Sequence, residues 1–135
     1  MVKYEEISVM TKSRTEWADI TSSVQGVVDS SGVRSGICIV SSLHTTAAIT
    51  INENADPDVG RDFFYKLNKI VDRDAAFRHG EGNSDSHIKA SLVGFSCQVP
   101  IQDGKLVLGT WQSVYFCEFD GPRGHRQSSV TVLGE

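Results

Sequence analysis

The chain lacks the features that mark secreted, membrane-spanning and nucleic-acid-binding proteins. Its three cysteines lie far apart and form no C-x-x-C pair, which favours buried, reduced thiols over a disulfide framework or a cysteine metal site. No run approaches the roughly 20 apolar residues that a membrane helix requires. Glu5 and Glu6 stand where a signal peptide would have its apolar segment. We therefore expect a cytoplasmic protein that has no contact with a membrane.

Positive charge is also scarce. The sequence has 13 Lys and Arg against 17 Asp and Glu, a net charge of −4, so its overall field repels a nucleic-acid backbone. No nucleic-acid partner is expected. Internal repeats, low-complexity tracts and linkers are missing too, and 39% apolar with 22% charged residues is ordinary for a globular fold. Residues 1–135 are therefore expected to form one domain.

Three segments have apolar residues at helical spacing, each with a start signal. They begin near Thr21, Pro57 and Ser84, and the first and third end at a glycine. In the third segment, Ile88 and Leu92 are expected to face the core. The sequence thus predicts about three helices.

The other apolar runs have the length and composition of strands. An Asp-Gly pair between two of them is a strong hairpin signal. The expected strands cover residues 3–11, 17–20, 36–41, 46–52, 96–101, 105–108, 112–119 and 126–133. Strands and helices are mixed at first, and only strands follow after residue 95. This order predicts an α+β fold with a mixed, largely antiparallel β-sheet or sandwich.

Two of the four histidines flank the start of the third helix. His87 lies in its first turns, where the helix dipole disfavours the imidazolium, so a neutral ring could bind a metal or move a proton. His79 lies eight residues earlier in the long irregular segment and could fold back to the same place. The alternatives are a histidine satisfied by local hydrogen bonds and a solvated loop histidine.

Groups that could bind an anion occur in two places. Free backbone N–H groups at residues 83–85 follow Gly80 and Gly82, an arrangement that phosphate can use, although a nearby carboxylate would compete. Arg123 and Arg126 form a compact cationic turn that could clamp a phosphate or a carboxylate. Exposed arginines in a turn are more often simply solvated.

Polar residues also flank the expected strand at 46–52. His44 precedes the strand, and on a straight strand Asn52 would lie roughly 27 Å from it, so the two share a small site only through a bend or a second subunit. Asn52 and Glu53 alternatively belong to the connection that caps the next helix. Trp111 and Gln112 join two strands, where a flat ring and an amide could border a ligand pocket, although a core tryptophan is equally consistent.

Several of these pieces together resemble the YjbQ family of small bacterial and archaeal proteins, over nearly the whole chain. The pieces are Ser42-Leu43-His44-Thr45-Thr46-Ala47-Ala48, Asn52-Glu53-Asn54, Asp56-Pro57, Ser86-His87-Ile88-Lys89, Gly109-Thr110-Trp111-Gln112 and Gly134-Glu135. The resemblance implies an α+β fold, a homotrimer, and in some members a weak, secondary thiamine-phosphate synthase activity. That activity joins a pyrimidine diphosphate to a thiazole phosphate.

The family's motif positions fall on these residues: His44, Asn52, Glu53, His79, His87, Trp111, Gln112 and Arg126. His125 and Arg123 lie where the resemblance implies variation, which leaves Arg126 as the better anion-binding candidate. Three imidazoles with an open position would suit zinc or a related divalent ion.

The residues and the resemblance lead to one hypothesis, a pocket at a subunit interface that holds a metal and a phosphorylated or carboxylated small molecule. The roles are as follows: His44, His87 and Glu53 catalytic; His44, His79 and His87 metal-binding; Asn52, Lys89, Trp111, Gln112 and Arg126 ligand-binding. The alternative is a non-enzymatic trimeric protein that binds a metal or ligand, favoured because the chain has no obvious acidic cluster for magnesium with diphosphate.

Overall fold

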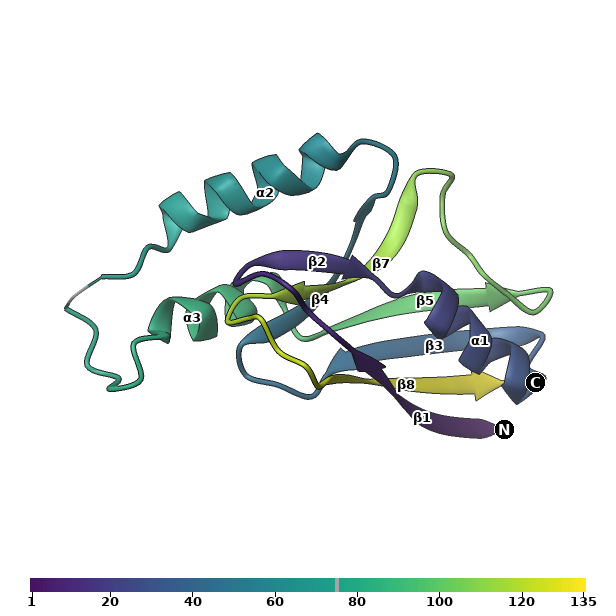
Figure 1. Ribbon diagram of the computed structural model, residues 1–135. Coiled ribbons are helices and arrows are strands. Elements are labelled where there is room, and N and C mark those ends of the chain that lie inside the picture. The colour runs from purple at the N-terminus through teal and green to yellow at the C-terminus, as the bar shows by residue number, and fades with distance from the viewer. Residues whose placement is uncertain (75) are drawn as a thin grey trace.

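The computed structural model describes residues 1–74 and 76–135, which form three helices and eight strands (Figure 1). The elements are β1 (Val2–Val9), β2 (Glu16–Asp19), α1 (Thr21–Ser31), β3 (Ser35–Ser42), β4 (Ala47–Glu53), α2 (Pro57–Ile70), α3 (Ser84–Val93), β5 (Ser96–Gln102), β6 (Lys105–Leu106), β7 (Gln112–Glu118) and β8 (Arg126–Gly134). Each expected element is present, and only β6 is much shorter than its predicted range.

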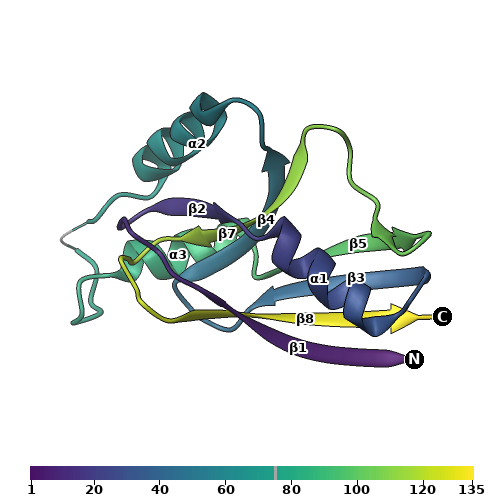
Figure 2. The same cartoon turned by 45° about the vertical axis from the view of Figure 1, so that its right-hand side comes forward.

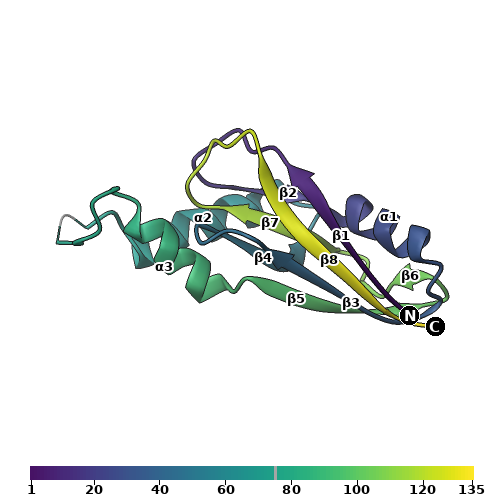
Figure 3. The same ribbon diagram turned by 90° about the horizontal axis from the view of Figure 1, so that it is seen from below.

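The strands form two sheets. One has five strands in the order β1-β8-β3-β5-β6, and the other has three in the order β2-β7-β4. Strands β1, β8, β3 and β5 of the larger sheet can be followed side by side in Figure 3. Every pairing among the described strands is antiparallel. The α+β class is therefore confirmed, with antiparallel sheets rather than a mixed one.

The larger hydrophobic core lies between the two sheets and α1, the helix in front of β3 and β5 in Figure 2. Val24, Val27 and Val28 of α1 are at most 3% exposed, because their spacing places them on one face of the helix. Gly32 ends the helix with φ of 72°, a conformation that glycine adopts without a Cβ clash. This confirms the predicted helix and its end at Gly32. Thr21, expected as the cap, is instead the first helical residue, and its hydroxyl accepts from the Val114 backbone N–H at 2.8 Å.

A second core lies on the other face of the three-stranded sheet, beneath α2 and α3. The Trp17 ring stacks on Tyr115 with centroids 4.4 Å apart and on Phe63 with centroids 5.3 Å apart. Gly60 of α2 lies so close to this ring that a Cβ would come within 2.8 Å of the indole. The close approach of Gly60 to Trp17 allows α2 to pack directly against the three-stranded sheet.

The third helix buries a different face from the one that its sequence predicts. Ile88 and Leu92 are 38% and 62% exposed, whereas Asp85, Ser86 and Lys89 are buried. The prediction was wrong because these polar groups find partners inside the protein, and paired polar groups can be buried at little cost. An apolar face of α3 consequently points to solvent.

The three cysteines are free, as expected. Burial raises the pKa of the Cys38 and Cys117 thiols to about 12 and that of Cys97 to about 11, so all three stay protonated at neutral pH. No described helix has the length and apolar character needed to span a membrane.

Candidate functional site

A polar pocket of about 300 Å³ lies where the β3–β4 loop, the segment before α3 and the β7–β8 loop meet. It is lined by His44, Thr45, Thr46, His79, Glu81, Asn83, His87, Asp120, Arg123 and Arg126. Four of the predicted site residues come together here from three distant parts of the sequence. They are the three histidines of the hypothesis and Arg126.

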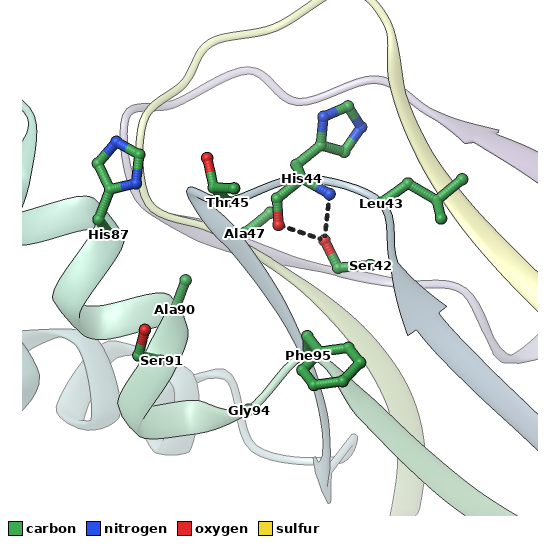
Figure 4. A pocket seen from close by; sticks show the side chains of 10 residues that line it. All are labelled: Ser42, Leu43, His44, Thr45, Ala47, His87, Ala90, Ser91, Gly94 and Phe95. Carbon is green, nitrogen blue, oxygen red and sulfur yellow. Dashed lines mark hydrogen bonds between the residues drawn. The ribbon is translucent and has the colours of Figure 1, made fainter.

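An apolar groove of about 590 Å³ adjoins the polar pocket and shares His44, Thr45 and His87 with it. The groove continues over Leu43 and three residues of small or aromatic character, Ala47, Ala90 and Phe95. In Figure 4, the two histidines lie at one end with Thr45 between them, and Phe95 lies at the other end. The polar pocket and the apolar groove therefore adjoin, with His44, Thr45 and His87 between them.

His44 is held as a hydrogen-bond donor toward the site. Its Nε2 atom accepts a 2.8 Å hydrogen bond from the backbone N–H of Gln127, so the neutral ring has its proton on Nδ1. Burial lowers the pKa of this histidine, and the positive charge of Arg126 lowers it further. His44 could serve as a metal ligand through Nε2 only if the Gln127 bond were released.

His79 and His87 lie edge to face, with ring centroids 5.2 Å apart. The irregular segment before α3 thus folds back and brings His79 to His87, as the spacing allowed. Within residues 1–74 and 76–135, however, no group of three or more His, Cys, Asp or Glu side chains is arranged to hold a metal ion. The three predicted imidazoles line one pocket without forming an assembled metal centre.

Arg126 forms one wall of the polar pocket and is only 4% exposed. Its guanidinium donates to both carboxylate oxygens of Glu118, with Nε 2.9 Å from Oε1, and Nη2 also donates to Thr46 Oγ1 at 2.8 Å. Burial alone would raise the pKa of Glu118, but hydrogen bonds from Arg126, Thr11 and the Asp120 backbone outweigh it and lower the pKa. The pair is therefore ionised, and the arginine is fixed in place.

Sequence reasoning missed Glu118 and Asp120, which support the pocket. A single carboxylate within the apolar run of β7 was the available signal, because such a group requires a buried partner. Asp120 accepts from Asn83 Nδ2 at 2.7 Å and from Arg123 Nη2 at 3.0 Å. Burial would raise the pKa of Asp120, but these two bonds and the charge of Arg14 lower it. Arg123 therefore pairs with a neighbouring carboxylate and does not form a free clamp with Arg126.

Lys89 lies in the interior and lines neither the polar pocket nor the apolar groove. It is 3% exposed, and its Nζ atom lies 2.7 Å from Asn68 Oδ1 and 3.2 Å from Asp85 Oδ2. The structure does not bring Lys89 to the predicted ligand site, because it points between α2 and α3. Lys89 links the two helices through its hydrogen bonds to Asn68 of α2 and Asp85 of α3.

The remaining predicted residues lie at the far end of the β4–β7 pair, and β4 itself spans about 20 Å from Ala47 to Glu53 at roughly 3.3 Å per residue. Glu53 Oε2 accepts from the Asp56 backbone N–H at 3.3 Å, and Gln112 Oε1 accepts from the Gly109 N–H at 2.8 Å. Asn52 and Trp111 are exposed. Within one chain these four residues do not reach His44, as the strand length predicted.

Comparisons with known proteins agree with this architecture. A family model described as UPF0047 protein YjbQ-like matches residues 5–135. The chain is 46% identical to a UPF0047 protein of Methanocaldococcus jannaschii, over 100% of this chain and 95% of that protein. An uncharacterised YjbQ/UPF0047 protein of Clostridium acetobutylicum has a crystal structure with a TM-score of 0.92 and 51% identity, covering 96% of this chain and 99% of that one.

A YbjQ-like protein of unknown function from Sulfolobus solfataricus has a crystal structure that matches with a TM-score of 0.95 at 35% identity. The match covers 100% of this chain and 99% of that one. The fold, the sequence identity and the family model thus all match the same group of proteins. The chain belongs to the YjbQ-like UPF0047 family.

Proposed function

We propose that the polar pocket and the apolar groove bind one small molecule, in which a phosphate or carboxylate group is attached to an apolar ring. The observation that supports this most directly is that the two cavities share His44, Thr45 and His87 in their linings. Sites for small molecules are concave and largely apolar, with a few polar groups that fix the ligand's orientation. This combination favours a ligand with one ionic end over a wholly polar or wholly apolar one.

Directed donors at the polar end recognise the anionic group. His44 offers Nδ1–H, Thr45 a hydroxyl, and Arg126 a guanidinium. The two arginines in the lining are matched by two carboxylates, Glu81 and Asp120. The net charge of the lining therefore supplies no attraction for an anion, and the geometry of the N–H and O–H donors sets the affinity.

The apolar end binds the ring. Phe95 is 66% exposed and Leu43 is 46% exposed, although both border the groove. An aromatic or heteroaromatic ring that covered them would remove apolar surface from water and stack on Phe95.

A divalent ion such as zinc is the second component of the proposal. The neighbouring imidazoles of His79 and His87 would serve as two nitrogen ligands, and oxygens of the bound anion and of water would fill the remaining positions. His44 fits poorly as a third, because its Nε2 atom already accepts from Gln127. When bound, the ion would supply additional positive charge for the phosphate.

We propose binding as the primary activity and a weak thiamine-phosphate synthase activity as a secondary one. In the synthase reaction, His44 and His87 orient the diphosphate and hydrogen-bond its oxygens, so that charge on the leaving pyrophosphate is stabilised. The absence of an acidic cluster for magnesium among the described residues supports a binding protein over a dedicated enzyme.

A second copy of the chain completes the site in this proposal, within a homotrimer. Beside the groove, Ile88, Leu92 and Phe95 expose apolar surface that a partner would cover. Trp111, 62% exposed at the far end of the molecule, provides a matching apolar surface, and Glu53 and the neighbouring amides Asn52 and Gln112 would accompany it.

Calorimetric titration with phenyl phosphate, inorganic phosphate and phenol tests the binding proposal. We expect phenyl phosphate to bind more tightly than either fragment, and His44→Ala to weaken it by about tenfold. The matched control is His125→Ala, an exposed histidine that lines neither cavity. Equal affinity for phenyl phosphate and inorganic phosphate would contradict the two-part site.

Two further measurements test the proposed metal ion and the proposed synthase activity separately. Elemental analysis of protein purified without a histidine tag should find a divalent ion that a His79→Ala, His87→Ala double variant loses. Turnover with the pyrimidine diphosphate and the thiazole phosphate should give kcat/KM far below the roughly 10⁴ M⁻¹s⁻¹ of ordinary enzymes. A value above that level would make catalysis the primary function.

A further inference from the structure

Arg14, in the loop between β1 and β2, contacts two of the three walls of the polar pocket without lining the pocket itself. One wall consists of residues 79–87 before and within α3, and the other of residues 119–126 after β7. These walls are far apart in sequence, and their relative position sets the width of the pocket. Arg14 thus lies outside the pocket and makes hydrogen bonds to both of these walls.

On the α3 wall, Arg14 Nη2 lies 3.2 Å from Asp85 Oδ1 and 3.3 Å from Ser86 Oγ. The Asp85 side chain is only 2% exposed, and Lys89 holds its second oxygen at 3.2 Å. Ser86 in turn donates to the carbonyl of Phe119 at 2.5 Å, which ties α3 to the opposite wall. Arg14 is thus anchored on the first turn of α3, immediately before His87.

On the opposite wall, Arg14 Nη1 lies 3.2 Å from Asp120 Oδ1. The other oxygen of Asp120 accepts from Asn83 Nδ2 at 2.7 Å and from Arg123 Nη2 at 3.0 Å, and both of these residues line the pocket. The Arg14 carbonyl also accepts from the Gly121 backbone N–H at 3.0 Å. The arginine therefore fixes the carboxylate that orients two pocket residues.

The hydrogen bond to Asp120 determines how the side-chain amide of Asn83 is oriented. Asp120 is ionised and accepts only, so Asn83 must turn its Nδ2 toward it. Its Oδ1 atom is left buried with no hydrogen-bond partner among the described residues, although an asparagine that precedes a helix usually caps it. Asn83 thus keeps its bond to Asp120 while its buried Oδ1 caps nothing, and such an unpartnered buried atom in a pocket residue requires an explanation.

We propose that Arg14 is a positioning residue for the ligand site, which acts through Asp120 on Asn83 and Arg123 and through Asp85 on the start of α3. The inference rests on the proposed binding function, and it adds a residue outside the pocket that sets its affinity. Arginine suits the task because its planar fork reaches two carboxylates at once, whereas lysine is a single point charge.

The test uses the full chain with Arg14→Met, which removes the charge and keeps the length of the side chain, and with Arg14→Lys. Arg61→Met is the matched control, since Arg61 pairs with Asp58 on the exposed surface of α2. Two quantities are measured: the affinity for phenyl phosphate by calorimetry, and the NMR shift of the Asn83 side-chain amide in the ligand-free protein. The second quantity needs no ligand.

We expect Arg14→Met to weaken phenyl phosphate binding by about tenfold and to move the Asn83 amide resonances, with only partial recovery in Arg14→Lys and no change in Arg61→Met. A folded Arg14→Met protein that keeps either its affinity or its Asn83 amide shift overturns the inference. If Arg14→Met does not fold, Asp120→Asn is used with the same two expectations. If the wild type fails to bind phenyl phosphate, the proposed function fails, and the amide shift alone then decides whether Arg14 orients Asn83.

Discussion

Replacing Arg126 with methionine tests whether the buried ion pair beneath the polar pocket is essential to the fold. The change removes the cation and leaves Glu118, which is 0% exposed, without its main partner. Breaking one side of a buried pair costs about 3–5 kcal/mol, because an uncompensated charge stays in the interior. We therefore expect a loss of this size in the free energy of unfolding at neutral pH.

The loss corresponds to a fall in Tm of about 10–18 °C, since the unfolding entropy of 135 residues is roughly 0.28 kcal/mol per kelvin. The difference in unfolding free energy between the wild type and Arg126→Met should narrow as the pH falls. In the wild type the pKa of Glu118 is lowered, so its contribution is present above the ordinary glutamate pKa and is lost below it. In the variant, burial would raise that pKa, and protonation at acidic pH would relieve the unpaired charge.

Differential scanning calorimetry at pH 7 and under mildly acidic conditions measures both effects. The control is Arg123→Met, whose side chain is 51% exposed in its ion pair and which should cost at most about 1 kcal/mol. A double variant, Arg126→Met with Glu118→Leu, should recover roughly 2–3 kcal/mol of the loss, because apolar replacements of a buried pair are well tolerated. The reasoning is refuted if the single variant costs less than about 1 kcal/mol or if the double variant is no more stable than the single one.

Two further predictions concern His44 and Gly60. The folded-state pKa of His44 is lowered, so the stabilisation from this residue is present above the ordinary histidine pKa of about 6.5. It is lost as the pH falls from that value through the lowered pKa. His44→Gln should therefore flatten the dependence of the urea unfolding free energy on pH in this range. An unchanged profile, or ¹⁵N shifts that show a proton on Nε2, would contradict the bond to Gln127. Gly60→Ala should destabilise the protein by about 1 kcal/mol or more despite the better helix propensity of alanine, since its Cβ would meet the Trp17 ring. A stabilised variant with an unchanged near-UV circular dichroism spectrum would contradict this packing.

The helix boundaries could be predicted because the signals that set them are local. The Asp56 side chain accepts from the Asp58 backbone N–H at 2.9 Å at the start of α2, with Pro57 as the first helical residue. Gly32 ends α1 in the left-handed conformation. Each of these interactions spans only a few residues, so it is visible in a short window of sequence.

The buried face of α3 could not be predicted, because the groups that stabilise it are distant in sequence. Asp85 pairs with Arg14, 71 positions away, and Lys89 with Asn68, 21 positions away. Apolar periodicity therefore indicated the wrong side of the helix. The same limit applies to the site: the spacing of His79 and His87 allowed their contact, but the tautomer of His44 depends on a backbone N–H 83 positions away.

Alternate side chains of β7 belong to the two hydrophobic cores, with Val114 and Phe116 in one and Cys117 in the other. Neither core can open without exposing this shared strand, so the domain should melt in a single cooperative transition. The loop that holds His44 joins β3 to β4, and β4 pairs with β7 along its full length. A molecule that binds beside His44 therefore stabilises the whole domain by mass action. A thermal-shift screen of phosphorylated and carboxylated metabolites thus becomes a direct route to the natural ligand.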